Sequence, residues 1–243
     1  MKRSIYILAS LFLTISMQAQ IIPQPKPGPA PSIKIGKPKT FELKNGLKVM
    51  VVENHKLPKV SFNLSIDNAP YSEGEKKGVS DLTSALIGSG TTKIPKDTFN
   101  EEIDFLGADI NFESNGAYAS GLSKYSNRIL ELMADGVLNP IFTQEEFDKN
   151  KAKFIEGIKA DEKSVPSVAR RVQSVLNYGK AHPNGEYLTE ATINNVTLAD
   201  VKSNYDTYFV PENAYLVIVG DVKFEAIKKQ VENLFNPWLK ATA

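Results

Sequence analysis

Two Asn-Gly dipeptides constrain the fold of this 243-residue chain most strongly. Asn45-Gly46 lies between two apolar stretches, residues 41–43 and 47–52, and Asn115-Gly116 lies between residues 109–113 and 118–123. Asn and Gly tolerate positive φ, so an Asn-Gly pair between alternating apolar residues predicts a tight β-hairpin. The sequence therefore predicts two antiparallel hairpins, separated by the stretch 53–108.

The stretches outside the hairpins alternate between strand and helix patterns. Residues 60–66 alternate apolar and polar with period two, which predicts a further strand with one buried face, and residues 214–219 predict a short buried strand. Apolar residues at helical spacing predict helices at residues 78–87, 97–106, 127–138, 143–163, 167–178, 197–209 and 223–235. This order predicts an α+β fold, in which helices cover a mainly antiparallel sheet.

Three regions are expected along the chain. Residues 1–19 combine Lys2 and Arg3 with an apolar run at residues 5–15 and a small Ala19, the pattern of a secretory signal peptide; an uncleaved membrane anchor is the alternative. Residues 20–37 are proline-rich, which favours an extended linker over a docking ligand. Residues 38–243 form the predicted domain. Export, with a periplasmic location, is the expectation, and no integral membrane span is expected after cleavage.

Composition excludes several classes of function. The chain has no cysteine, 2 histidines, 29 basic and 28 acidic residues. The missing thiols exclude disulfides, thiolate nucleophiles and cysteine metal sites. The near-neutral charge gives no basis for nucleic-acid binding. His55 and His182 are far apart in sequence, and we interpret them as a solvated loop residue and a turn residue.

Several strings, in order and at matching spacing, resemble one known family. They are LKNGLKVMVVEN from Leu43, GVSDLTSALIGSGTT from Gly78, FLGADINFESN from Phe105, AHPNG from Ala181 and YFVPENAYLVIVGDV from Tyr208. Together they resemble the N-terminal domain of the insulinase, pitrilysin and mitochondrial-processing-peptidase type of inverted-zincin metallopeptidases. The resemblance covers about residues 38–240.

The resemblance implies a zinc site whose residues this chain lacks. Active members carry a His-x-x-Glu-His helix, whose two imidazoles bind zinc and whose Glu activates water, and a later Glu as third ligand. Those positions fall here on Asp81, Ser84, Ala85 and Gly157, with Glu156 about 100° of helix away from the last. No catalytic residue, no bound metal and no cofactor are therefore predicted, and hydrolysis by the family mechanism is not expected.

Three functions remain open at this level. The first is a catalytically silent, exported subunit that binds peptide and completes the chamber of a zinc-bearing homologous peptidase, as the resemblance to empty family subunits implies. The second is a divergent zinc metallopeptidase with a relocated site. The third is a structural envelope module. Peptide affinity and zinc content distinguish the three.

Overall fold

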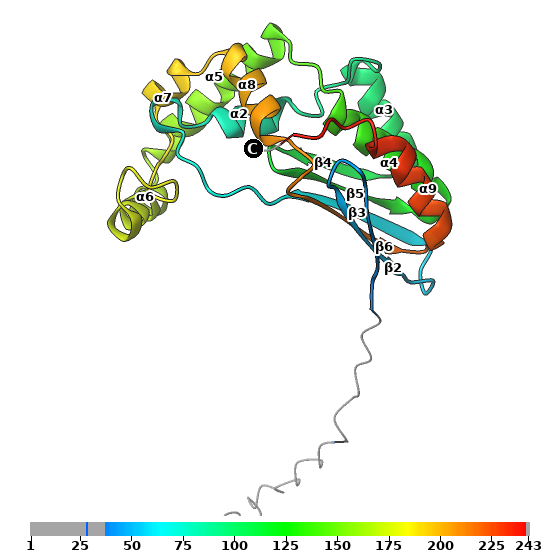
Figure 1. Cartoon of the computed structure of the whole chain (residues 1–243). Coiled ribbons are helices and arrows are strands. Elements are labelled where there is room, and N and C mark those ends of the chain that lie inside the picture. Colours follow the sequence, from blue (N-terminus) through cyan, green and yellow to red (C-terminus); the bar gives the residue numbers. More distant parts are fainter. Residues whose placement is uncertain (1–27, 29–36, 242–243) are drawn as a thin grey trace, which may run out of the picture. The chain divides into compact units, whose positions relative to one another are not determined.

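The computed structural model describes residue 28 and residues 37–241 (Figure 1). The expected signal peptide lies outside the described residues, as does almost all of the expected linker. Among the helices that are described, none combines the length and the apolar character that a bilayer crossing requires.

One mixed sheet organises the domain. Its six strands run in the order β1-β2-β6-β3-β5-β4, and only β2 and β6 pair in parallel. The strands are β1 Lys39–Glu42, β2 Lys48–Glu53, β3 Lys59–Ile66, β4 Asp109–Glu113, β5 Gly116–Leu122 and β6 Ala214–Gly220. The α+β class and the mainly antiparallel sheet are confirmed. The late strand β6 enters the middle of the sheet between β2 and β3.

Both hairpins form, but neither has the tight Asn-Gly turn that the sequence predicted, because the first pair lies within a longer loop and the second turn is displaced by one residue. The first loop runs from residue 43 to 47, and Asn45 is buried within it. The second turn is Ser114-Asn115, and Gly116 already belongs to β5. Gly116 is required there because a Cβ would lie 2.0 Å from the carbonyl oxygen of Leu64 on β3. Close approach of two strands, and not the turn, explains this glycine.

One face of the sheet is covered by helices (Figure 1). The helices α3 Lys96–Leu106, α4 Ser126–Leu138 and α9 Phe224–Phe235 pack on it and form one hydrophobic core with the inward residues of the strands. The period-two pattern of β3 explains this directly, because Val60, Phe62, Leu64 and Ile66 are buried while Asn63 and Ser65 are exposed. The opposite face of β3 carries no such cover.

A second group of helices has its own core. It comprises α2 Val79–Leu86, α5 Gln144–Asp161, α7 Glu190–Asn195 and α8 Leu198–Tyr208. Leu82 and Leu86 of α2 pack there with Phe147 and Ile158 of α5 and with Ile193 of α7. The helix α6 Val165–Tyr178 lies beside this group (Figure 1). The sequence pattern did not predict α7.

Candidate functional site

The helix α2 places three of the four predicted positions on one face. Val79, Leu82 and Leu86 are buried in the second core, whereas Asp81, Ser84 and Ala85 share a half-buried face, with Ala85 packed against the margin of that core. This division follows from the 3.6-residue period of the helix. The structure therefore presents the three residues together, as the resemblance implied.

Ser84 has a structural use. Its hydroxyl accepts a hydrogen bond from the backbone N–H of Ser114 at 2.7 Å and donates one to the carbonyl oxygen of Ser80 at 3.0 Å. Ser114 directly follows β4, so this hydroxyl ties α2 to the end of the edge strand. A hydroxyl held in this way cannot activate water, because its pKa lies far above neutrality and its hydrogen-bonding groups are engaged.

The other positions offer almost no ligand atoms. Burial raises the pKa of the Asp81 carboxyl, and the opposing effect of Lys77 is the smaller one. Asp81 thus supplies one half-buried carboxyl. Ala85 carries only a methyl group. Gly157 on α5 has no side chain, and a Cβ there would meet nothing within 4 Å.

A zinc ion does not fit this residue set. Tetrahedral zinc sites need three or four nitrogen, sulfur or carboxylate ligands, whereas the four positions supply a single half-buried carboxyl. Within residues 37–241 there is no group of three or more His, Asp or Glu side chains close enough to hold a metal ion. Glu156, next to Gly157, is exposed on α5.

Two carboxylates that the sequence analysis missed organise the start of α2. Glu73 accepts hydrogen bonds from the backbone N–H of Gly78 and from Ser80 Oγ, and it pairs with Lys77. Glu186 accepts from the backbone N–H groups of Glu73 and Gly74 and from the hydroxyl of Ser72. No sequence motif indicated these two contacts. Glu73 lies before the start of α2, and Glu186 lies more than 100 residues from Glu73 and Gly74 in sequence.

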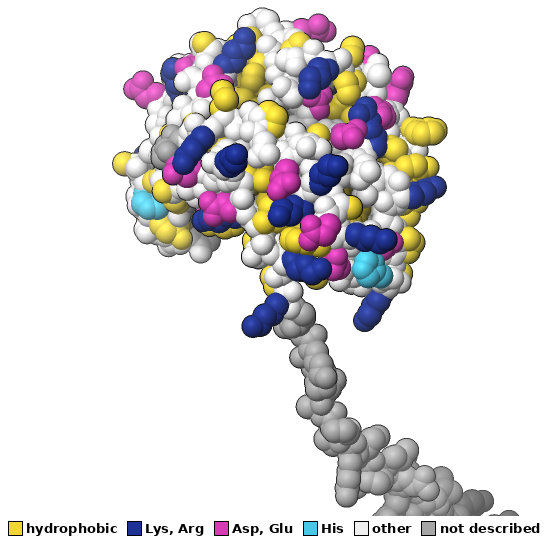
Figure 2. All heavy atoms as spheres, turned by 45° about the vertical axis from the view of Figure 1, so that its right-hand side comes forward, with side chains coloured by type: hydrophobic (Ala, Val, Ile, Leu, Met, Phe, Trp, Pro, Cys, Tyr) yellow, Lys and Arg dark blue, Asp and Glu magenta, His cyan; other side chains and the backbone are white. Residues whose placement is uncertain are grey.

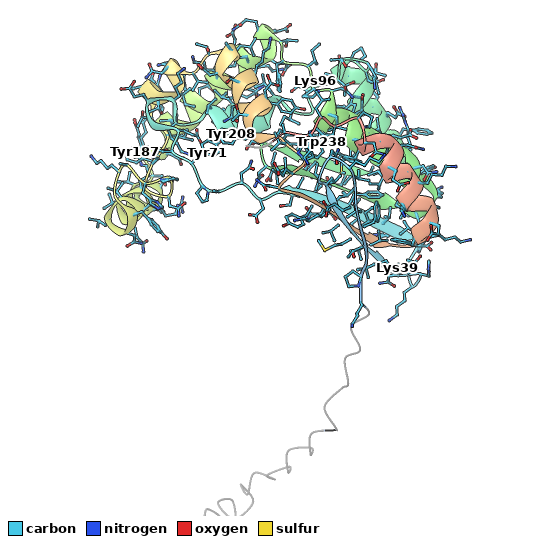
Figure 3. All side chains as sticks on the ribbon, viewed as in Figure 1. Lys39, Tyr71, Lys96, Tyr187, Tyr208 and Trp238 are labelled. Carbon is cyan, nitrogen blue, oxygen red and sulfur yellow. The ribbon has the colours of Figure 1, made fainter. Side chains whose placement is uncertain are left out.

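An aromatic pair lies near the same helical group. The rings of Tyr71 and Tyr208 stack with centroids 3.8 Å apart and planes within 3° of parallel (Figure 3). Asn204 donates a hydrogen bond to the Tyr71 hydroxyl at 2.9 Å, and burial raises the pKa of Tyr71. These contacts attach the loop before α2 to the end of α8, which fixes the position of α2.

Neither histidine lies with the predicted site residues. His182 accepts a hydrogen bond from the backbone N–H of Asn184 and stacks on Tyr178, which agrees with a turn role. His55 is exposed in a turn, as expected for a solvated loop residue, and its Nδ1 also lies 2.6 Å from Asp221 Oδ1. The hydroxyl of Ser123 donates a hydrogen bond to the other oxygen of Asp221, and not to His55. The three residues are therefore not arranged as a catalytic triad, in which the histidine accepts the proton of the serine.

The edge strand β4 lies beside the face of α2 that carries Asp81, Ser84 and Ala85. Among the described strands, β4 pairs only with β5, so the backbone groups along its other edge have no strand partner. Its residues alternate, with Ile110 and Phe112 half-buried and Asp109, Asn111 and Glu113 exposed. Neither Asp109 nor Glu113 forms an ion pair with another described residue. An open edge of this kind can accept an extended peptide as an additional strand.

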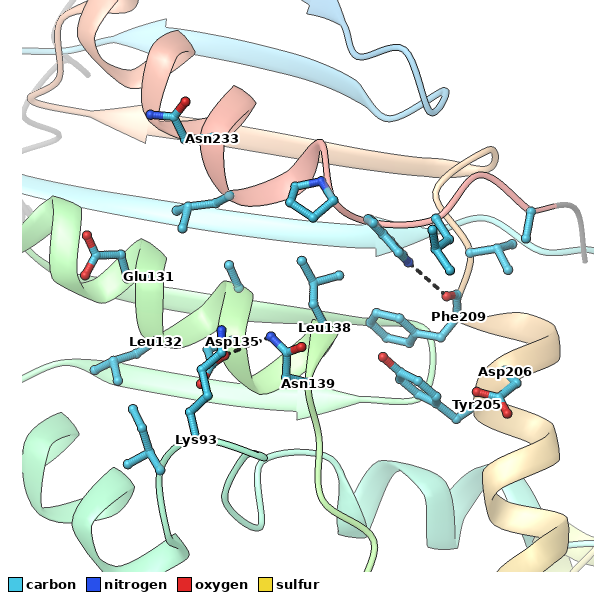
Figure 4. Close-up of a pocket in the computed structure, with 18 of the residues that line it drawn as sticks. Lys93, Glu131, Leu132, Asp135, Leu138, Asn139, Tyr205, Asp206, Phe209 and Asn233 are labelled. Atoms are coloured by element: carbon cyan, nitrogen blue, oxygen red, sulfur yellow. Dashed lines mark hydrogen bonds and ion pairs between the residues drawn. The ribbon is translucent and has the colours of Figure 1, made fainter.

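A cavity of about 910 Å³ lies elsewhere, between α4, the end of α8 and the segment 237–241 (Figure 4). Asp135 in its wall pairs with Lys93 and accepts from Asn139, while its Oδ2 is buried without a hydrogen-bond partner. None of Asp81, Ser84, Ala85 and Gly157 lines this cavity. It is therefore separate from the predicted site.

The surface charges are mixed. On the face that Figure 2 presents, acidic and basic side chains alternate over the domain and no large area carries one sign. Polyanions are bound through concentrated positive charge. The structure thus gives no support on this face for a nucleic-acid interface.

Two family models match the sequence of this chain. A family model described as "Insulinase (Peptidase family M16)" matches residues 48–183, which is more than half of the chain. A second model, described as "Peptidase M16 inactive domain", matches residues 195–242.

The relatives include both zinc proteases and a non-peptidase. An "Uncharacterized zinc protease" of Rickettsia felis is 27% identical over 202 residues, covering 80% of this chain and 49% of the relative. A "Non-peptidase homolog YmxG" of Helicobacter pylori is 22% identical over 200 residues, covering 79% and 46%. The chain thus spans about half the length of these curated relatives.

The fold has a solved counterpart. A crystal structure of a peptidase M16 inactive domain from Pseudomonas fluorescens superposes with a TM-score of 0.75 at 23% identity, covering 85% of this chain and 52% of that one. At this identity the likeness concerns the fold alone.

Proposed function

We propose that this chain, which belongs to the insulinase family (peptidase family M16), is a catalytically silent subunit that binds extended peptides. The observation that carries the proposal is the residue set on α2 and α5. The family positions for two zinc ligands, the base and the third ligand hold Asp81, Ala85, Ser84 and Gly157, and Ser84 is engaged in holding β4. A helix that once bound metal would then serve to position the edge strand.

The open edge of β4 supplies the binding surface in this proposal. A peptide that pairs with β4 gains backbone hydrogen bonds without any need for metal. The exposed carboxylates of Asp109 and Glu113 would lie beside such a peptide on one face of the extended sheet. Basic side chains at alternate positions of the peptide would therefore be favoured by charge complementarity.

The partner in this proposal is a zinc-bearing homologous peptidase. The name of the Helicobacter pylori relative, a non-peptidase homologue, supports a silent member within the family. A silent subunit contributes to proteolysis only if another chain supplies the zinc. We further propose that the chain is exported and meets this partner in the periplasm, on the basis of the signal-like residues 1–19.

Backbone-modified peptides test the binding mode. A fluorescent Lys-rich peptide of extended sequence is titrated into the full chain and its anisotropy is measured. Two further versions carry N-methyl groups at either the odd or the even residues. Strand addition predicts that one methylated version loses binding and the other retains it, because only alternate N–H groups face β4. Equal binding of both versions would contradict strand addition.

The fate of the peptide tests catalytic silence in the same samples. The account predicts that mass spectrometry recovers the peptide intact, with or without a chelator. Cleavage that a chelator abolishes would instead establish a relocated metal site. A chain that binds none of the three peptides would match a structural envelope module.

A further inference from the structure

The helix α6 turns mainly polar side chains toward the domain. Ser167, Arg170, Arg171 and Ser174 recur at helical spacing and line a small cavity of about 290 Å³ together with Glu186 and Tyr187. Ser167 is buried and accepts a hydrogen bond from Arg170, and the guanidinium of Arg171 lies over the ring of Tyr187. Surface helices normally turn their apolar side to the core. In α6, Val168 and Val175 are half-buried, but the other aliphatic residues face away from the domain.

Much of the apolar side of α6 is consequently exposed. Val165 and Leu176 are each 79% exposed, Val172 is 52% exposed, and Ala169 between them is exposed as well. We call these four residues the α6 stripe. They are spaced by four, three and four residues, which is the spacing of a helix-pairing seam. The stripe extends over about 17 Å at 1.5 Å per residue.

We infer that the α6 stripe pairs with the stripe of a second copy of this chain, in antiparallel orientation about a two-fold axis. The spacing of the stripe reads the same in both directions. An axis between residues 170 and 171 therefore sets Val165 opposite Leu176 of the second copy, and Ala169 opposite Val172. Large side chains then meet at the ends, and the small Ala169 allows close approach near the axis.

Charge complementarity supports the second copy as occupant. Exposed Glu162 precedes α6, and exposed Lys180 follows it. Neither side chain forms an ion pair with another described residue. Antiparallel pairing brings each Glu162 toward Lys180 of the other copy, whereas parallel pairing would bring like charges together. The stripe itself carries no charge, so pairing leaves no charge buried in the seam.

The contact area indicates a weak dimer. One 14-residue helix from each copy buries less than the roughly 1,200 Å² typical of stable protein interfaces. The association should therefore depend on concentration. The contact uses a surface apart from α2 and β4, so this inference does not depend on the proposed function.

Light scattering across a concentration series tests the pairing with the full chain. We expect a monomer–dimer equilibrium that Val172→Glu weakens by roughly 100-fold, because a carboxylate would enter an apolar seam. Gln173→Glu is the matched control, since Gln173 is exposed on α6 but off the stripe, and it should leave the equilibrium within about threefold. A chain that is monomeric throughout, or a dimer unaffected by Val172→Glu, would overturn the inference.

Cross-linking tests the orientation, and the absence of native cysteine makes every introduced thiol unique. An Ala169→Cys chain is mixed with a Val172→Cys chain and treated with a short bismaleimide. Antiparallel pairing predicts cross-linking mainly between the two different variants. Cross-linking of each variant only to itself would overturn the antiparallel arrangement. Binding of the stripe to lipid vesicles or to a zinc-bearing homologue, by an otherwise monomeric chain, would assign it to that occupant and overturn self-pairing.

Discussion

Asn45 shows how one polar side chain connects distant segments of the chain. Its side-chain N–H₂ donates to the carbonyl oxygens of Phe235 and Trp238, and its Oδ1 accepts from the backbone N–H of Leu47. The Asn-Gly pattern predicted a hairpin correctly. It could not reveal that Asn45 is buried, because the partner carbonyls lie about 190 residues away.

Replacing Asn45 with Ala should lower the free energy of unfolding by about 2 to 3 kcal/mol. The substitution removes three hydrogen bonds and leaves buried backbone groups without partners. Urea denaturation followed by circular dichroism measures the change. Exposed Asn54→Ala is the matched control and should cost less than about 0.5 kcal/mol. An Asn45 variant as stable as the control would contradict this role.

Glu102 provides a pH-dependent contribution to stability. Arg128 binds both of its carboxylate oxygens, at 2.5 and 2.8 Å, which joins α3 to α4 and lowers the pKa of Glu102. A carboxyl whose pKa is lower in the folded state stabilises the fold above its unfolded pKa. That contribution is lost as the pH falls through the lowered value.

Glu102→Gln should therefore be less stable than the wild type at pH 7, by about 0.5 to 1 kcal/mol for this partly exposed pair. The difference should vanish in acid below the lowered pKa of Glu102. Thermal denaturation at a series of pH values measures it, with exposed Glu101→Gln as the control. A stability difference that persists unchanged in strong acid would argue against the ion pair.

At the scale of elements, α2 and β4 form the unit on which the proposed function depends. The sequence predicted both elements and assigned Asp81, Ser84 and Ala85 to one helix. Their joint position on the half-buried face followed from helical periodicity. The hydrogen bond from the Ser114 N–H to Ser84 could not be predicted, because it depends on how the second hairpin packs against α2.

Removing the carboxylates of the edge strand should weaken binding of basic peptides. Asp109→Asn with Glu113→Gln keeps side-chain size while removing two negative charges. We expect about a three- to tenfold rise in Kd for a Lys-rich peptide at low salt, and little change for a neutral peptide of the same length. Anisotropy titrations at two ionic strengths measure both. An equal loss for the two peptides would point to damage of the strand instead of lost charge.

At the scale of the whole molecule, local patterns predicted most of the fold. The hairpins, the amphipathic helices and the strand predicted at residues 214–219 all carry local signals in their own sequence. Local sequence patterns could not predict the order of the strands. The strand β6 lies between β2 and β3 in the sheet, although several helices separate it from them in sequence. The exposure of the α6 stripe could not be predicted either, because periodicity shows that a helix is amphipathic but not which side faces the protein.

The proposed silent role requires that the zinc site is lost, and the zinc content of the chain tests this loss. The purified full chain is equilibrated with zinc, passed through a desalting column and analysed for metal. We predict no stoichiometric zinc in the wild type. In the variant with Asp81→His, Ser84→Glu, Ala85→His and Gly157→Glu, which restores the family's ligands and base, we predict about one zinc per chain. One tightly held zinc per wild-type chain would show that the zinc site is not lost.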